Sequence, residues 1–62
     1  MCESNAFLRK AGKDELLLEN VTVLRPEKGR WVLSSLLGDT MTVDADIIEI
    51  DLMAHKIVLM ER

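Results

Sequence analysis

The sequence contains few of the side chains on which covalent or aromatic chemistry depends. Among its 62 residues there is one cysteine, one histidine and no tyrosine, and Phe7 and Trp31 are the only aromatic residues. A single cysteine excludes a disulfide within the chain. So few rings also disfavour a platform for single-stranded nucleic acid, on which successive bases stack against aromatic side chains.

The sequence also lacks a long apolar run and an excess of positive charge. No stretch approaches the roughly 20 apolar residues that cross a bilayer as a helix, so no membrane association is expected. The opening MCESNAFLRK has no apolar core of the kind found in signal peptides. With a free thiol, this favours the reducing cytoplasm. Eight basic residues against 11 acidic ones give a net charge of −3, which disfavours nucleic-acid binding.

The arrangements that usually carry catalysis are missing as well. There is no glycine-rich phosphate loop, and neither Ser34 nor Ser35 lies in a nucleophile-elbow pattern. The carboxylates are scattered along the chain, as they are on a solvated surface. We therefore expect a protein that is not an enzyme.

Short apolar runs separated by turn residues predict a single all-β domain over residues 1–62, with about six or seven short strands. This spacing is typical of a small barrel or sandwich. Gly12 and Gly29 mark expected hairpin turns. Pro26 is expected to end the third strand because it has no N–H for a ladder. The expected strands cover 5–10, 15–19, 21–25, 30–37, 40–44, 46–53 and 56–60.

Two segments admit more than one interpretation. Residues 14–20 contain good helix formers, but a helix of about two turns is marginal in isolation, so a strand is favoured there. Residues 56–60 are apolar on both faces, and such a strand needs cover on both. A second subunit could supply one of the two covers, because chains of this size often need a metal or a partner. Met41, Met53 and Met60 are expected to fill the core.

Cys2 is the strongest candidate for chemistry because of its position. Removal of Met1 would leave the α-amine and the thiolate of Cys2 free to chelate one cation in a five-membered ring. The backbone amide nitrogen of Glu3 could add a third donor. Mixed nitrogen and thiolate donors suit square-planar Ni(II) or Cu(II), and a two-fold homodimer would duplicate them at its axis. The alternative is that Cys2 is a small buried residue that serves packing alone.

His55 is the second candidate. Its imidazole could act as an additional ligand, since neutral imidazole suits nickel, copper and zinc. The alternative is that His55 is a water-exposed residue in the turn between two strands.

The chain resembles the CooT family of small nickel-binding accessory proteins. The resemblance is carried by MCESNA at 1–6, ELLLENV at 15–21, IEIDL at 48–52 and HKI at 55–57. It implies a small SH3-like β-barrel, a homodimer, and Ni(II) binding that depends on Cys2. It further implies a role in nickel insertion into carbon monoxide dehydrogenase or another nickel enzyme. The implied partners are that enzyme or its other maturation factors.

Two other functions remain open from the sequence. Relatives with this pattern have been labelled RNA-binding proteins, so a small RNA-binding β-barrel is one alternative. A structural dimer without a metal role is the other. Nickel is named by the resemblance, because the Irving–Williams order alone would favour copper at a site with nitrogen and sulfur donors.

Overall fold

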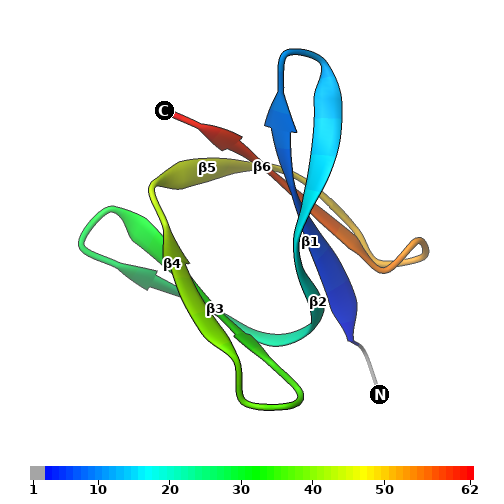
Figure 1. Cartoon of the computed structure of the whole chain (residues 1–62), viewed down its shortest axis with the longest axis vertical. Coiled ribbons are helices and arrows are strands. Elements are labelled where there is room, and N and C mark those ends of the chain that lie inside the picture. Colours follow the sequence, from blue (N-terminus) through cyan, green and yellow to red (C-terminus); the bar gives the residue numbers. More distant parts are fainter. Residues whose placement is uncertain (1–2) are drawn as a thin grey trace.

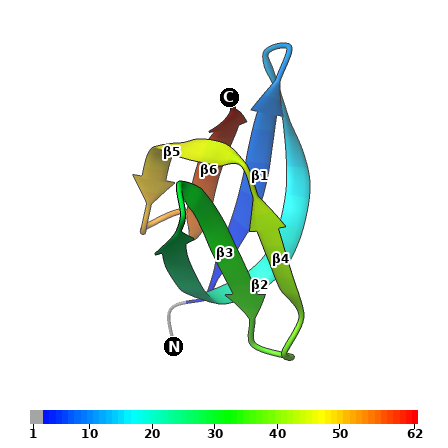
Figure 2. The same cartoon turned by 90° about the vertical axis from the view of Figure 1, so that its left-hand side faces the viewer.

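A computed structural model describes residues 3–62, in which a single six-stranded sheet curls around an apolar interior (Figures 1 and 2). Its strand order is β4-β3-β2-β1-β6-β5. All neighbouring strands are antiparallel except β1 and β6, which are parallel. The predicted all-β fold is thereby confirmed, as a curled half-barrel. The strands are β1 (Ser4–Lys10), β2 (Lys13–Glu27), β3 (Arg30–Ser35), β4 (Thr40–Val43), β5 (Ala45–Asp51) and β6 (Lys56–Glu61).

Two tight hairpins join the first three strands. At each of them a non-glycine residue is followed by glycine, and both residues have positive φ: Ala11 and Gly12 in the first turn, Lys28 and Gly29 in the second. Positive φ at both central positions is the geometry of a type I′ turn, whose twist matches that of the flanking strands. Both hairpin turns expected from the sequence are therefore confirmed.

The prediction of two separate strands between residues 15 and 25 is wrong. β2 is one strand of 15 residues that continues through Asn20. Asn20 has a φ of 54°, and the pairing register shifts on either side of it. Asn20 is a bend within β2 because asparagine tolerates this left-handed conformation better than most residues. The strand interpretation of residues 14–20 is confirmed against the helical one.

Pro26 does not end β2, which runs on to Glu27. The pairing between β1 and β2 reaches only to Val21, so β1 does not run beside Pro26. Pro26 pairs with Trp31 of β3 alone. Proline is tolerated at such an edge because its missing N–H can face away from the ladder. The strands expected at 30–37 and 46–53 also end two residues early, at Ser35 and Asp51.

The core lies on the concave face of the sheet. Leu33 and Leu59 are the largest side chains of the core cluster that are fully buried. Met41 packs against this cluster as expected, but Met53 is 93% exposed and Met60 is 44% exposed, so the prediction that they fill the core is wrong. The cluster comprises Ala6, Val21, Leu33, Ala45, Ile57 and Leu59.

β6 is buried on both faces within this one chain. Ile57 and Leu59 belong to the core cluster, while Val58, at the alternate position, is also fully buried and pairs with Phe7 of β1. On this second face the Nζ atom of Lys56 lies 5.5 Å from the centroid of the Phe7 ring. A second subunit is therefore not needed to bury either face of β6, because this chain buries both. None of the elements within residues 3–62 is a helix that could cross a membrane.

Candidate metal centre at the start of the first strand

The parallel pairing of β1 with β6 brings the start of β1 beside the turn that contains His55. Asn5 pairs with Lys56, and the backbone N–H of Asn5 donates a hydrogen bond to the His55 carbonyl at 2.8 Å. His55 is exposed and has a φ of 53°. The carboxylate of Asp51 shapes the same turn, since its Oδ1 accepts a hydrogen bond from the Ala54 N–H at 3.0 Å. The turn therefore holds His55 at the end of the sheet where β1 begins.

The other candidate ligands lie just ahead of β1. Cys2 falls outside the described residues, so the positions of its thiolate and its α-amine are not given by the structure. Glu3, whose amide nitrogen is a further candidate, is the first described residue and is half-buried. Within residues 3–62, no three histidine, aspartate or glutamate side chains gather into a metal-binding group.

The first residues of β1 are held from both sides. Ser4 is buried and pairs with Val21 of β2. The Asn5 side chain accepts a hydrogen bond at Oδ1 from the backbone N–H of Asn20, at 3.2 Å. Together with the bond from Asn5 to His55, these contacts fix the start of β1, which follows Glu3 directly in the sequence.

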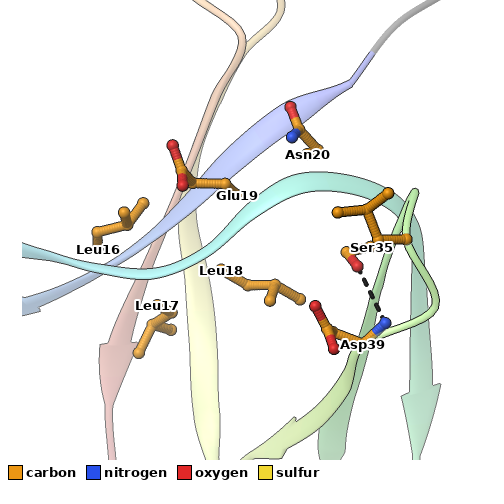
Figure 3. A pocket seen from close by; sticks show the side chains of 8 residues that line it. Leu16, Leu17, Leu18, Glu19, Asn20, Ser35 and Asp39 are labelled. Atoms are coloured by element: carbon orange, nitrogen blue, oxygen red, sulfur yellow. Dashed lines mark hydrogen bonds between the residues drawn. The ribbon is translucent and has the colours of Figure 1, made fainter.

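A hollow of about 310 Å³ lies against the bent part of β2 (Figure 3). It combines leucine side chains with polar groups, and at its rim the Ser35 hydroxyl oxygen accepts a hydrogen bond from the Asp39 N–H at 3.0 Å. The sequence pattern does not predict this hollow, because the bent part of β2 around Asn20 lines it. An asparagine inside an apolar strand is the one sequence signal that could have indicated it. Its lining residues are Leu16, Leu17, Leu18, Glu19, Asn20, Ser35, Leu37 and Asp39.

A separate charged cluster lies on the convex face. The Asp14 carboxylate is bound by Arg9 Nε at 2.8 Å and by Lys56 Nζ at 3.3 Å. The hydrogen bond from Arg9 is the main reason that the pKa of Asp14 lies below its ordinary value, and Lys56 lowers it further. The same hydrogen bond raises the pKa of Arg9. The Asp14 carboxylate thus already has two cationic partners, and one of them, Lys56, lies over the Phe7 ring.

The fold itself is shared with a solved structure. A crystal structure of a protein assigned as CooT from Carboxydothermus hydrogenoformans is 33% identical to this chain, with a TM-score of 0.94 and 98% of each chain covered. The chain therefore belongs to a class of small proteins built from one curled β-sheet. No match is found among curated proteins.

The family follows from the sequence comparison. A family model described as CO dehydrogenase accessory protein CooT matches residues 1–60, which is nearly the whole chain. The chain belongs to the CooT family of CO dehydrogenase accessory proteins. The resemblance noted in the sequence is thus confirmed, and the match includes the segment that contains Cys2.

Proposed function

We propose that this chain binds Ni(II) at the N-terminal Cys2 of a homodimer and assists nickel insertion into CO dehydrogenase or another nickel enzyme. The observation that carries the proposal is the match of residues 1–60 to a family of CO dehydrogenase accessory proteins. A protein that serves a nickel enzyme without being that enzyme is well suited to carry the metal as cargo. Cys2 is the one thiol available to hold it.

The proposed donors have the right chemistry for Ni(II). After loss of Met1, the Cys2 thiolate and α-amine chelate the ion, and the amide nitrogen of Glu3 can join them. Nitrogen and sulfur donors of this kind suit square-planar Ni(II). A two-fold axis between two subunits repeats the same residues, so two copies of Cys2 can share one ion. A site with so few protein ligands can release its cargo.

The anchored start of β1 supports this location. A metal site is more precise when the residues around it stand on rigid elements. Asn5 is bonded to both the β5–β6 turn and β2. In the sequence, the proposed donors at Cys2 and Glu3 come directly before this anchored strand start. His55 belongs to the same end of the sheet and is our proposed additional ligand.

Calorimetric titration with Ni(II) tests the proposal, using chain from which Met1 has been removed. We expect strong binding by the unmodified chain, none by Cys2→Ser, and weaker binding by a chain whose α-amine is acetylated. His55→Asn is the matched variant for the imidazole, because asparagine also tolerates positive φ. Unchanged Ni(II) binding in Cys2→Ser would refute the site. Analytical ultracentrifugation of the same samples tests the homodimer.

The pH dependence of binding separates amine ligation from other modes. Thiol and amine must lose protons to bind a metal, and their reference pKa values are about 8.5 and about 7.7–8.0. The apparent affinity for Ni(II) should therefore rise steadily from mildly acidic to mildly basic pH. A flat profile across that range would contradict ligation by the amine.

A further inference from the structure

The end of the sheet formed by β5 exposes a row of large apolar side chains. Ile48 is 43% exposed, Ile50 54%, Leu52 73% and Met53 93%. They follow one another along β5 and into the turn after it, whereas Ala45 at the start of β5 is buried in the core. Scattered apolar residues on a surface are ordinary, but a contiguous group of them marks an interaction site. We call residues 48–53 the β5 edge.

The backbone of this segment is open on one side. β5 is the last strand of the sheet and pairs with β6 alone, as Figure 2 shows at the outer end of the molecule. The register of that pairing shifts between Ile47 and Glu49, so Ile48 forms a bulge. An exposed sheet edge offers N–H and C=O groups to an added strand. An extended peptide can use these groups while its alternate side chains contact the apolar row.

Both charged residues of the β5 edge, Glu49 and Asp51, are acidic. The cations beside them are Lys56, which lies opposite Asp51 in β6, and Arg9, which acts on Glu49, and both are bound to Asp14. Residues 31–55 contain five acidic residues and no lysine or arginine. Two of the five, Asp44 and Asp46, are paired with Arg62 at 3.8 Å and 3.0 Å. Glu49 and Asp51 alternate with the isoleucines and leucine of the edge itself. A complementary occupant therefore needs lysine or arginine side chains at alternate positions.

The acidic residues of the β5 edge argue against a second copy of this chain as its occupant. If two β5 edges met around a two-fold axis, Glu49 and Asp51 of one copy would approach the carboxylates of the other. Like charges opposite one another across paired strands are destabilising, and the cations beside Glu49 and Asp51, which are Arg9 and Lys56, are already bound to Asp14. An anionic membrane surface or a nucleic acid would be repelled in the same way.

We propose that the β5 edge docks an extended segment of a different protein, in which aliphatic residues alternate with lysine or arginine. The segment adds as a strand beside β5, with its aliphatic side chains against Ile50 and Leu52 and its cations beside Glu49 and Asp51. The turn that closes the edge also contains His55. Docking here would bring a client to the end of the sheet where the cargo is held, a link that rests on the proposed function.

Nuclear magnetic resonance with two matched peptides tests the docking edge. The probes are acetyl-KVKVKVK-amide and acetyl-EVEVEVE-amide, titrated into labelled, metal-free Cys2→Ser chain. We expect the lysine peptide to shift the amide signals of residues 48–53 and the glutamate peptide to leave them unchanged. The double variant Leu52→Ser/Met53→Ser and the variant Glu49→Lys should each weaken binding at least tenfold.

Two control variants make the test specific. Leu37 is 83% exposed in the turn between β3 and β4, so Leu37→Ser removes a comparable apolar side chain elsewhere. Glu27→Lys reverses a charge at the β2–β3 hairpin. Both should leave the affinity for the lysine peptide unchanged.

Three results would overturn the docking edge. They are equal binding of both peptides, shifts confined to other residues, and a dimer that dissociates in Leu52→Ser/Met53→Ser, which would assign the surface to a second copy. Because the titration contains no nickel and no Cys2 thiol, none of them bears on the metal site. Conversely, unchanged Ni(II) binding in Cys2→Ser would refute the metal site and leave the β5 edge intact.

Discussion

The N–H of Asn5 donates to the carbonyl of His55 at 2.8 Å, so the first strand begins where the last turn ends. This bond belongs to the parallel pairing of β1 with β6. It ties the position of the N-terminal segment to the conformation of a turn almost at the other end of the sequence. The backbone of His55 therefore has a structural role, whatever its imidazole binds.

Substitutions at His55 should separate its backbone role from its side chain. A φ of 53° is unfavourable for most residues with a Cβ, and asparagine accepts it more readily than a β-branched residue does. We expect His55→Asn to leave the free energy of unfolding nearly unchanged and His55→Val to lower it by about 1–2 kcal/mol. Urea denaturation of both variants measures the difference. Equal stability of the two would contradict the strained turn.

The Asp14 cluster should make stability depend on pH in the acidic range. In the folded chain the pKa of the Asp14 carboxyl group is lowered, chiefly by the hydrogen bond from Arg9. A lowered pKa means that the cluster stabilises the fold fully above the unfolded value of about 3.9 and loses this effect as the pH falls through the folded value. The melting temperatures of wild type and Asp14→Asn should therefore differ at pH 5–7 and converge below about pH 4.

The Arg9→Met background provides the control for that experiment. Without Arg9, the main partner of Asp14, the difference in melting temperature between chains with Asp14 and with Asp14→Asn should shrink at neutral pH. A gap that persists unchanged to the lowest pH would contradict the role assigned to the carboxylate. Glu49 also faces Arg9 and contributes to its charge environment, so Glu49→Gln should be measured alongside.

Two leucines only a few residues apart should respond very differently to truncation. Leu33 is fully buried, whereas Leu37 is 83% exposed. Leu33→Ala leaves a cavity in the core and should cost about 2–5 kcal/mol, a large share of the total stability of so small a domain. Leu37→Ala should change the free energy of unfolding by less than about 0.5 kcal/mol. Chemical denaturation followed by Trp31 fluorescence, with both variants at one concentration, measures this contrast.

Local patterns were enough to predict most strands and both hairpins. The alternation over β5 and the glycines at 12 and 29 carry their signal within a few residues, so no knowledge of distant contacts is needed. The errors arise where contacts between distant parts of the chain decide where a strand ends and which residues are buried. Pro26 is accommodated because β1 no longer runs beside it, and Met53 is exposed because β5 has already ended.

The candidate site was predictable only in part. The position and type of Cys2 could be read directly, since both are properties of the sequence. The proximity of His55 to the start of β1 depends on a parallel pairing between the two ends of the chain, which no local pattern encodes. The cover over Val58 was missed for a similar reason. Val58 pairs with Phe7 in the same parallel ladder. Lys56 reaches over the Phe7 ring to Asp14, as charged side chains with long apolar stems can do.

The bend at Asn20 gives the last prediction, because it shapes both β2 and the hollow beside it. Asn20 combines a φ of 54° with two backbone hydrogen bonds, one from its N–H to Asn5 Oδ1 and one from the Leu36 N–H to its carbonyl. Glycine adopts this conformation freely, whereas alanine adopts it only at a cost, as Ala11 does in the first hairpin turn. The free energy of unfolding of Asn20→Gly should therefore lie within about 0.5 kcal/mol of the wild-type value. That of Asn20→Ala should be lower by about 1 kcal/mol or more. Amide exchange at Leu36 should accelerate in Asn20→Ala alone. If both variants were equally destabilised, the side chain of Asn20 rather than its backbone conformation would hold the bend.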